Sequence, residues 1–389
     1  MSAVLQTTVG QATLETLETP CLLLDELRMQ ANIDRMKTRM ARLGVALRPH
    51  LKTPKSIDVA RLAMLTEQGP AAVSTLQEAE QFGHAGVRDI LYAVGVSAAK
   101  IDRVLALRRQ GVDLVVVVDS VAGAQAVADR SRAAAMPIPA LIEIDTDGHR
   151  AGVRPDQAEL LKAIGSALHH GGAELRGVMT HAGESYNSGD LEAIRAMAEQ
   201  ERAGAVRAAE TLRAEGLPCP VVSVGSTPTA VYAENLDGVT EVRAGVYVFF
   251  DLFMAGIGVC RQDDIALSVL ATVIGHQADK GWILVDAGWM AMSRDRGTAR
   301  QAVDQFYGVV CDLQGRPYAD LVMKDANQEQ GILRMRPGSS ASLPDLPLGA
   351  RVRILPNHAC ATGAQHDAYQ VVRGAAPEVL ATWPRFRGW

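Results

Sequence analysis

The sequence predicts an α/β fold, in which a (β/α)8 barrel of the TIM type is followed by a second, C-terminal β-domain. Short apolar runs alternate with helical stretches from about residue 26 to residue 250, a pattern typical of a parallel sheet built from βα units. The barrel region contains eight such runs, and eight parallel strands close a barrel. Beyond about residue 255, β-like runs and Gly- and Pro-rich connectors replace the helices, which predicts a separate β-domain.

The expected elements follow one another along the chain. Helical stretches lie at residues 56–68, 97–110, 121–135 and 191–216, and the last ends on a glycine that suits a helix C-terminus. The expected domains are an N-terminal segment over 1–25 that joins the β-domain, a barrel over 26–254 and the β-domain over 255–389. The expected barrel strands are residues 45–50, 71–75, 89–94, 113–119, 139–145, 175–181, 220–225 and 241–248, and β-runs follow at 265–276, 281–288 and 350–359.

Composition and charge exclude several classes of protein. A formal net charge of -5 lacks the basic excess that nucleic-acid binding requires, so no nucleic-acid partner is expected. The opening segment lacks the charged and apolar regions of a secretion signal, and no run of about 18 apolar residues occurs, so we expect a soluble, cytoplasmic protein without membrane association. The odd number of singly placed cysteines predicts packing or chemistry rather than disulfides; they are Cys21, Cys219, Cys260, Cys311 and Cys360.

Unusual polar residues follow several of the expected barrel strands, at the end where such barrels place their active sites. Lys52 follows the first strand, beside Arg48 and His50. By position alone a lysine is a solvated surface residue. Neighbouring cations and partial burial, however, favour the neutral amine that Schiff-base chemistry needs. Further polar strand ends lie at residues 145–150, 181–183 and 225–227.

The turn Gly225-Ser226-Thr227 follows an apolar strand and offers backbone N–H groups and two hydroxyls in a small space. Such a composition suits a phosphate monoester. Turns of this composition are also common connections between a strand and a helix. The turn alone therefore leaves both interpretations open.

His358 and Cys360 follow the β-run at residues 350–357. Residues two apart on an extended strand face the same way, so an imidazole and a thiolate could bind one cation there. Two protein ligands leave open positions for water or substrate, as a catalytic metal needs. The alternative is coincidence, because a single cysteine is often simply buried.

A family resemblance joins these residues. The segments TPCLLLDELRMQANIDRM, RPHLKTPKS, IEIDTDGHRAGV, THAGESY, VVSVGSTPT, EVRAGVYVFFD, VDAGWMAMSRDRGT and PNHACATGAQ together resemble the fold-type III pyridoxal-phosphate (PLP) enzymes, the family of D-serine dehydratase and D-threonine aldolase. The resemblance extends from about residue 19 to the C-terminus. It implies an alanine racemase-like barrel with a C-terminal β-domain, assembled as a homodimer in which the partner's second domain helps to close each site.

The resemblance also implies the site residues. Lys52 would bind PLP as a Schiff base and act as the base, and a divalent metal (Zn, Mn, Co or Mg) would be bound by His358 and Cys360, so that all three take part in catalysis. Many relatives carry a histidine at the position of Pro54, so that side chain's role is absent here. The other expected cofactor-binding residues are His50, Arg150 near the ring oxygen, His181 and Tyr186 beside the ring, and Gly225, Ser226, Thr227, Gly245 and Tyr247 at the phosphate.

The implied reaction is elimination from a small D-3-hydroxyamino acid. PLP acts as an electron sink, and a metal bound to the 3-hydroxyl lowers the barrier to its loss. The expected substrate is D-threo-3-hydroxyaspartate, which would give oxaloacetate and ammonia. Its second carboxylate needs a cation in a closed pocket; the candidates are Arg294, Arg296 and Arg300, whose alternative is a place on the surface.

Several rival functions use the same scaffold. D-serine dehydration differs only in substrate. A D-threonine or 3-hydroxyaspartate aldolase would break the Cα–Cβ bond, and relatives with that activity typically carry Asp where this chain has Cys360. A racemase would not need His358 and Cys360, and PLP-carrying regulatory proteins lack the second domain.

Overall fold

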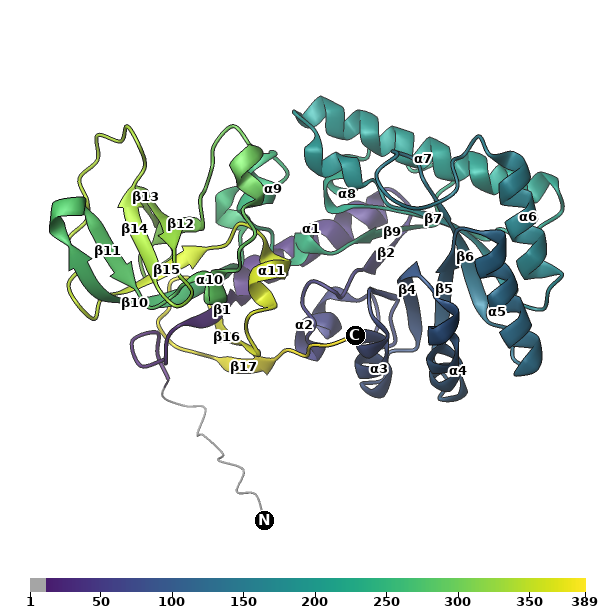
Figure 1. Cartoon of the computed structure of the whole chain (residues 1–389), viewed down its shortest axis with the longest axis horizontal. Coiled ribbons are helices and arrows are strands. Elements are labelled where there is room, and N and C mark those ends of the chain that lie inside the picture. The colour runs from purple at the N-terminus through teal and green to yellow at the C-terminus, as the bar shows by residue number, and fades with distance from the viewer. Residues whose placement is uncertain (1–11) are drawn as a thin grey trace, which may run out of the picture. The chain divides into compact units, whose positions relative to one another are not determined.

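The structure is a computed structural model of the chain and describes residues 12–389 (Figure 1). Residues 1–11 of the opening segment, where no secretion signal was expected, lie outside the described residues. One compact unit comprises residues 33–247 and 386–389, and the other comprises the described residues up to 32 and residues 248–385. Within residues 12–389, no helix combines the length and apolar character needed to cross a membrane.

The first unit is a parallel barrel with helices outside its strands (Figure 1). The sheet runs β2-β9-β8-β7-β6-β5-β4-β3. A single parallel bridge between His50 and Ala72 joins its two ends, so the barrel is nearly closed. All eight expected strands are present, and the last is shorter than expected. The strands are β2 (Ala46–Pro49), β3 (Ala71–Val73), β4 (Asp89–Gly95), β5 (Asp113–Val118), β6 (Pro139–Ile144), β7 (Glu174–Thr180), β8 (Val221–Val224) and β9 (Glu241–Ala244).

Local sequence explains where the longest barrel helix begins and ends. In the longest, the Asp190 side chain accepts a hydrogen bond from Ala193 N. Gly216 follows this helix with φ of +73°, a conformation that glycine adopts without strain. The helices are α1 (Glu26–Arg42), α2 (Ile57–Ala63), α3 (Leu76–His84), η1 (Ala98–Lys100), α4 (Ile101–Arg109), α5 (Val121–Ala133), α6 (Ala158–His169), η2 (Gly183–Asn187), α7 (Leu191–Ala214), α8 (Thr227–Tyr232) and η3 (Val246–Val248).

The barrel strands differ in what they bury. An apolar cluster spans β3 to β7 and includes Leu91, Val115, Val117, Leu141 and Met179. Strands β2, β8 and β9 instead carry buried polar side chains in a connected network, described below. Of this network, Arg243 lies near the carboxyl ends where the cofactor residues were expected, since it donates to Thr180 O and its charge acts on His50 and His181.

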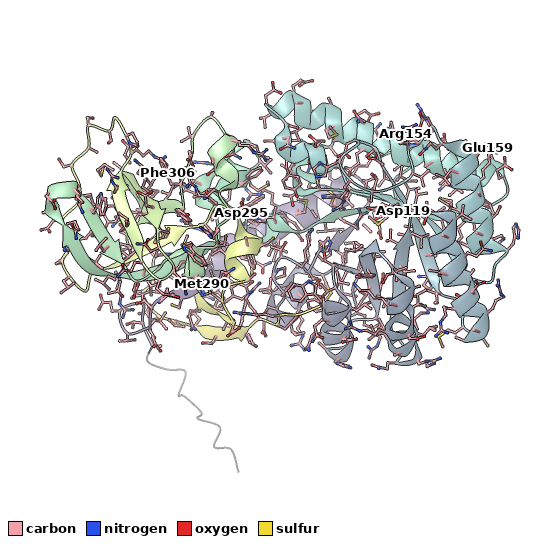
Figure 2. All side chains as sticks on the ribbon, viewed as in Figure 1. Asp119, Arg154, Glu159, Met290, Asp295 and Phe306 are labelled. Carbon is pink, nitrogen blue, oxygen red and sulfur yellow. The ribbon has the colours of Figure 1, made fainter. Side chains whose placement is uncertain are left out.

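The second unit is a nine-stranded sheet in the order β11-β14-β13-β12-β15-β10-β1-β16-β17, with a further pairing of β10 and β11. Strand β1 lies between β10 and β16, so residues 21–25 at the end of the N-terminal segment are part of this sheet. The connection from β11 to β12 carries Asp295 and Phe306, both labelled in Figure 2. The strands are β1 (Cys21–Asp25), β10 (Leu267–Gln277), β11 (Trp282–Val285), β12 (Gly308–Cys311), β13 (Pro317–Ala326), β14 (Gly331–Met335), β15 (Arg351–Leu355), β16 (Ala368–Val372) and β17 (Ala381–Pro384); the helices are α9 (Leu252–Gly256), η4 (Gln262–Asp264), η5 (Ala278–Lys280), α10 (Trp289–Met292), η6 (Gly297–Arg300) and α11 (Ala359–Gly363).

The boundary between the units differs slightly from the one expected at residue 254. The first unit ends at Tyr247, and helix α1 contributes residues to both units. Residues 386–389 return to the barrel unit, where Phe386 packs against Phe82 with ring centroids 5.0 Å apart. Phe386 N also donates to Lys55 O at 2.9 Å, and Arg103 donates to Trp389 O at 3.3 Å. Sequence pattern alone could not place this short C-terminal return, because these partners lie far away along the chain.

Candidate active site

The expected cofactor-binding residues all belong to the barrel unit and follow the carboxyl ends of its strands. The barrel geometry therefore brings them to one end. His50 and Lys52 follow β2, Arg150 follows β6, His181 and Tyr186 follow β7, Gly225, Ser226 and Thr227 follow β8, and Gly245 and Tyr247 follow β9.

Two lysines follow strand β2, and the structure distinguishes them. Lys55 Nζ lies 3.1 Å from Oε1 of the buried Glu78, so this lysine forms an ion pair. Lys52 occupies a turn between the buried residues Leu51 and Thr53, with its own side chain exposed. Its charge acts on both His50 and His181. Lys52 is thus the lysine of this segment that lies near the other cofactor candidates.

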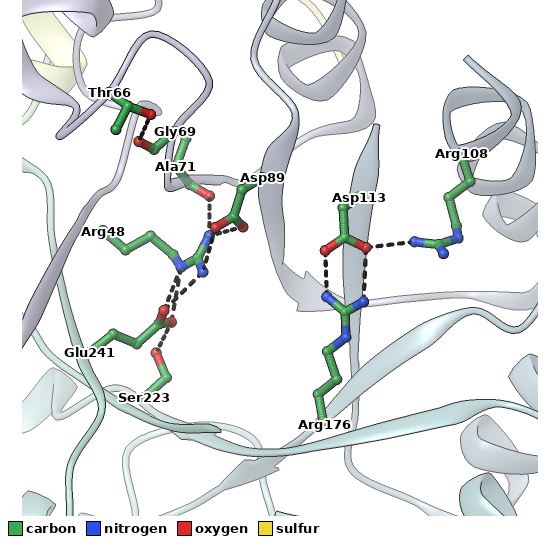
Figure 3. Close-up of polar contacts among 10 residues, drawn as sticks. All are labelled: Arg48, Thr66, Gly69, Ala71, Asp89, Arg108, Asp113, Arg176, Ser223 and Glu241. Carbon is green, nitrogen blue, oxygen red and sulfur yellow. Dashed lines mark hydrogen bonds and ion pairs between the residues drawn. The ribbon is translucent and has the colours of Figure 1, made fainter. Parts of the chain in front are cut away.

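Arg48, expected beside Lys52, lies instead toward the amino ends of the strands (Figure 3). Its guanidinium Nε donates to both carboxylate oxygens of Glu241 at 2.9 Å. One terminal nitrogen donates at 2.6 Å to Asp89, the first residue of β4. The expectation that Arg48 lies beside Lys52 was wrong. The Arg48 side chain points into the barrel from within β2, whereas Lys52 follows the end of that strand.

Two histidines at the carboxyl end of the barrel are neutral. Burial lowers the pKa of His181 to about 3, against an ordinary value of 6.5. His181 Nδ1 lies 2.8 Å from the carbonyl oxygen of Gly225, so this nitrogen donates and Nε2 carries the lone pair. Burial also lowers the pKa of His50. Three cations act in the same direction on both rings; they are Lys52, Arg150 and Arg243.

The carboxyl ends of β8 and β9 fit a phosphate group. The side-chain oxygens Thr227 Oγ1 and Tyr247 Oη are both buried and have no hydrogen-bond partner among residues 12–389. Buried hydroxyls without partners are costly and therefore rare. Gly245 gives a close approach here, since a Cβ on it would lie 2.8 Å from Thr53 Oγ1. Two unpaired donors in the part of the barrel where Lys52, Arg150 and Arg243 act on His50 and His181 match the needs of a bound phosphate.

The Ser226 hydroxyl, expected at the phosphate, takes part in internal contacts. Ser226 Oγ accepts from Thr229 N at 3.2 Å and lies 2.8 Å from Ser185 Oγ. It therefore caps helix α8, with the side chain of Thr229 bonding back to Ser226 N. Thr227 is the residue of the turn whose hydroxyl is left for a ligand.

Two buried residues near the site were not predicted from the sequence. Arg243 donates to Ser223 Oγ at 2.6 Å and to the carbonyl oxygen of Thr180, immediately before His181. Its charge in the middle of the run EVRAGVYV was a usable signal, because a charge inside a barrel strand must be paired. Glu201 on α7 is fully buried, and burial raises the pKa of its carboxyl. Nothing distinguishes it in sequence from the exposed glutamates of the same helix.

The metal candidates His358 and Cys360 do not lie on an extended strand, which corrects the sequence interpretation. Strand β15 ends at Leu355, and Pro356 follows it with no N–H to continue the ladder. His358 is the N-cap of α11 and Cys360 is the second residue of that helix. The two side chains are nevertheless close enough to form a hydrogen bond. A helix start, rather than strand alternation, brings them together.

The carboxylate of Asp295, which is labelled in Figure 2, contacts His358. His358 Nδ1 lies 2.6 Å from Asp295 Oδ2, which leaves Nε2 for a metal. Burial lowers the pKa of His358, but the hydrogen bonds to Asp295 and Cys360 outweigh it and raise the pKa to about 11. An imidazole and a thiol with this negative surrounding suit a borderline-soft divalent cation. Within residues 12–389, no group of three or more His, Cys, Asp or Glu side chains is placed to hold a metal ion, so His358 and Cys360 are a pair of candidate ligands only.

The three arginines after β11 have different surroundings. Arg296 forms an ion pair with Asp304 at 2.7 Å and lies over the rings of Phe306 and Tyr307. Arg294 lies over the ring of Trp289 and is exposed. Arg300 is also exposed. The charge of Arg296 is therefore already neutralised, which leaves Arg294 and Arg300 as candidates for an acidic substrate group.

A parallel barrel and an antiparallel β-domain in one chain define an enzyme of the alanine racemase-like fold class, a PLP-dependent fold family. Residues 24–252 match the family described as alanine racemase, N-terminal domain, and residues 266–372 match a putative serine dehydratase domain. The chain belongs to this family of alanine racemase-like PLP enzymes.

Individual relatives cover nearly the whole chain. D-threo-3-hydroxyaspartate dehydratase of Delftia sp. (strain HT23) is 60% identical over 97% of this chain and 100% of its own length. A solved structure of that dehydratase matches with a TM-score of 0.93 at 59% identity, covering 97% of this chain and 100% of the other. A cysteine variant of it was solved in a metal-free form. D-serine dehydratase of Dictyostelium discoideum is 28% identical (92% and 94% covered), and 3-hydroxy-D-aspartate aldolase of Paracoccus denitrificans is 29% identical (95% and 91% covered).

Proposed function

We propose that the chain is a PLP- and divalent-metal-dependent dehydratase of D-3-hydroxyamino acids, and that its main substrate is D-threo-3-hydroxyaspartate. Loss of water from this substrate followed by hydrolysis, which returns the water, yields oxaloacetate and ammonia. The observation that carries the proposal is that one chain contains both the residues suited to PLP and a pair of residues suited to a metal. A cationic barrel end has two unpaired buried hydroxyls, and a His-Cys pair has its imidazole oriented by a carboxylate. Full-length similarity to D-threo-3-hydroxyaspartate dehydratase supports the substrate.

The residues of the barrel have distinct tasks in this proposal. Bound PLP supplies a ring that stabilises negative charge at the substrate Cα. Thr227 Oγ1 and Tyr247 Oη would donate to its phosphate, and neutral His181 would contact the ring. Lys52 would hold the cofactor and would serve as the base that takes the proton from Cα.

The β-domain supplies the metal ligands in this proposal. Cys360 as a thiolate and Nε2 of His358 would hold a divalent cation, which supplies a Lewis acid for the 3-hydroxyl. Asp295 holds the proton on Nδ1 and keeps the ring oriented. Cys360 favours dehydration over aldol cleavage, because the resemblance places Asp at this position in aldolases.

Product analysis tests the proposal. The purified chain, supplied with PLP and Zn²⁺ or Mn²⁺, is incubated with D-threo-3-hydroxyaspartate or with D-serine. We expect oxaloacetate and ammonia from the first substrate at the higher kcat/KM, and pyruvate and ammonia from the second. Glycine and glyoxylate would instead identify an aldolase, and a change of configuration alone would identify a racemase.

Cofactor binding is tested separately from turnover. We expect an absorption band of lysine-bound PLP that Lys52→Ala abolishes and Lys55→Ala retains, because Lys55 pairs with Glu78. A wild-type protein that takes up no PLP contradicts the proposal. We further infer a homodimer, as the family resemblance implies; sedimentation equilibrium measures this directly.

A further inference from the structure

Glu201 is a buried carboxyl that connects separate segments of the barrel unit. It lies on α7 and is 2% exposed. Its Oε1 accepts hydrogen bonds from Ala182 N and Gly225 N, each at 2.9 Å. Its Oε2 accepts from Thr229 Oγ1 at 2.8 Å. The three donors come from the loop after β7, the turn after β8 and the first turns of α8, so one side chain fixes three backbone segments.

The same segments are joined a second time through hydroxyl groups. Thr229 Oγ1 lies 3.0 Å from Ser226 Oγ, and Ser226 Oγ lies 2.8 Å from Ser185 Oγ. Ser185 Oγ donates to the carbonyl oxygen of Ala182 at 2.7 Å. Because Ala182 N returns to Glu201, these polar contacts form a ring, and all of its side chains are buried. Thr229 donates to Glu201 and Ser185 donates to Ala182, so the single proton of Ser226 serves one of its two hydroxyl neighbours at a time. A connected buried network of this kind restricts the movement of its surroundings.

This ring surrounds the two groups that the proposed function places beside the cofactor. His181 directly precedes Ala182 and donates from Nδ1 to the carbonyl oxygen of Gly225. Thr227, whose hydroxyl has no partner among the described residues, follows Ser226. The ring takes up the N–H of Gly225 and the hydroxyl of Ser226, so neither is available to a ligand. What it provides is the placement of Thr227 and His181 relative to each other.

Burying a carboxyl on a helix costs free energy. Desolvation disfavours its charged form, and an apolar residue at the same position would avoid that cost. The three donors compensate for the burial only as long as the β7 loop and the β8 turn keep their places. The carboxyl therefore stabilises one arrangement of these two loops over others.

We propose that Glu201 is a positioning residue for the cofactor's phosphate: through the ring with Ser185, Ser226 and Thr229 it holds the turn Gly225-Ser226-Thr227 against the loop that carries His181. This inference rests on the proposed function, because it requires that the turn bind the phosphate of PLP. It assigns no contact between Glu201 and the cofactor. It does predict that loss of Glu201 weakens binding of the phosphorylated ligand specifically.

The test compares PLP with pyridoxal, which lacks the phosphate. Equilibrium dialysis gives the affinity of each ligand for the wild type, Glu201→Ala, Glu201→Gln and the matched control Glu199→Ala. Glu199 lies on the same helix at the surface, paired with Arg202. We expect Glu201→Ala to weaken PLP by about 10-fold or more, as for loss of charged hydrogen bonds, and to leave pyridoxal within about 2-fold.

Glu201→Gln separates the network from the charge. The glutamine Oε1 still accepts from Ala182 N and Gly225 N, and its Nε2 donates to Thr229 Oγ1, so we expect PLP affinity close to that of the wild type. Glu199→Ala should change neither affinity. If Glu201→Ala does not fold, Ser185→Ala opens the ring without removing the carboxyl, and the same selective loss of PLP is read from that variant.

Two results overturn the inference: equal weakening of PLP and pyridoxal in these variants, or unchanged PLP affinity in a folded Glu201→Ala. A wild type that binds neither ligand would instead contradict the proposed function. Thermal unfolding of the cofactor-free variants is measured alongside, because a purely structural role would lower the melting temperature without changing the ratio of the two affinities.

Discussion

Individual side chains at the barrel end are held in the protonation state that the proposed chemistry needs. His181 is neutral because burial outweighs its hydrogen bond to Gly225, and nearby cations act in the same direction as burial. A charged imidazole here would repel Lys52 and would need a second acceptor. The neutral ring instead offers a lone pair at Nε2, toward which a ligand can donate.

The lowered pKa of His181 predicts a stability that depends on pH. The folded state keeps this ring neutral down to about pH 3, whereas the unfolded chain takes up a proton below the ordinary value of 6.5. The unfolded state therefore gains stability as pH falls through this window. For this histidine the free energy of unfolding should drop by up to about 1.4 kcal/mol per pH unit.

Urea unfolding of the cofactor-free protein at about pH 7.5 and about pH 5.5 measures this dependence. His181→Asn, whose amide can donate to the carbonyl oxygen of Gly225, should reduce it. The exposed His84→Asn serves as the control and should leave it unchanged. An identical dependence in His181→Asn would show that other groups cause it.

Asp295 is a second residue whose role is to orient another. Its hydrogen bond to His358 Nδ1 fixes the tautomer that presents Nε2 to a metal. Asp295→Ala should lower metal affinity by about 10- to 100-fold, and Asp295→Asn by less because an acceptor oxygen remains. Titration with Co²⁺, followed by the thiolate-to-cobalt absorption, measures this without turnover. Asp325→Ala, an exposed carboxylate on β13, is the control, and equal affinity in all four proteins would exclude the role.

The arginines after β11 should differ in how their substitution changes kcat/KM for the two substrates. If Arg294 or Arg300 binds the second carboxylate of hydroxyaspartate, its change to Ala should cost about 1.5 to 3 kcal/mol in kcat/KM for that substrate and little for D-serine. Arg296→Ala should affect both substrates alike, because Arg296 already pairs with Asp304. Steady-state kinetics of the three variants on both substrates decides this, and equal losses throughout would assign the second carboxylate to other groups.

At the scale of elements, ion pairs and hydrogen bonds connect β2, β8 and β9, the barrel strands that lie outside the apolar cluster. Arg48 on β2 pairs with Glu241 on β9, and Glu241 in turn accepts from Ser223 on β8 at 2.6 Å (Figure 3). Arg243 continues the chain of contacts toward His181. The polar side of the barrel is thus one network rather than separate pairs.

Removing one member of this network should lower the free energy of unfolding more than removing two paired members. Arg48→Met leaves Glu241 buried without its main partner, and should cost about 3–5 kcal/mol of unfolding free energy. Arg48→Met with Glu241→Leu should recover part of that loss. Arg316→Met, which breaks an exposed pair with Asp312, should cost no more than about 1 kcal/mol. Urea denaturation of the wild type and these three variants checks this; a double variant no more stable than Arg48→Met alone would contradict it.

Element patterns were sufficient to predict the barrel but not the details of its site. All eight strands follow from apolar runs, because both faces of a parallel strand are buried. The contribution of Glu201 and Asp295 depends on contacts between residues 19 to 63 positions apart, and a local pattern carries no such information. The proximity of His358 and Cys360 was expected on strand geometry, but the chain forms a helix start after Pro356.

At the scale of the whole molecule, the two kinds of site residue are divided between the compact units. The expected cofactor residues all lie within residues 33–247, and His358, Cys360 and Asp295 lie within residues 248–385. Each unit has its own sheet and its own core. The cofactor and the metal are therefore expected to bind independently.

This division predicts the result of removing the metal. Chelation should abolish turnover of D-threo-3-hydroxyaspartate, because the 3-hydroxyl loses its Lewis acid. It should leave the absorption band of lysine-bound PLP in place, since none of the proposed phosphate or lysine contacts belongs to the metal cluster. Absorbance and activity are recorded together during dialysis against a chelator, and again after Zn²⁺ or Mn²⁺ is restored.

His358→Ala with Cys360→Ala should behave as the chelated enzyme does and should not recover on adding metal. Full activity in that double variant would exclude a catalytic metal at this pair, and loss of the PLP band on chelation would show that the two units bind their ligands cooperatively.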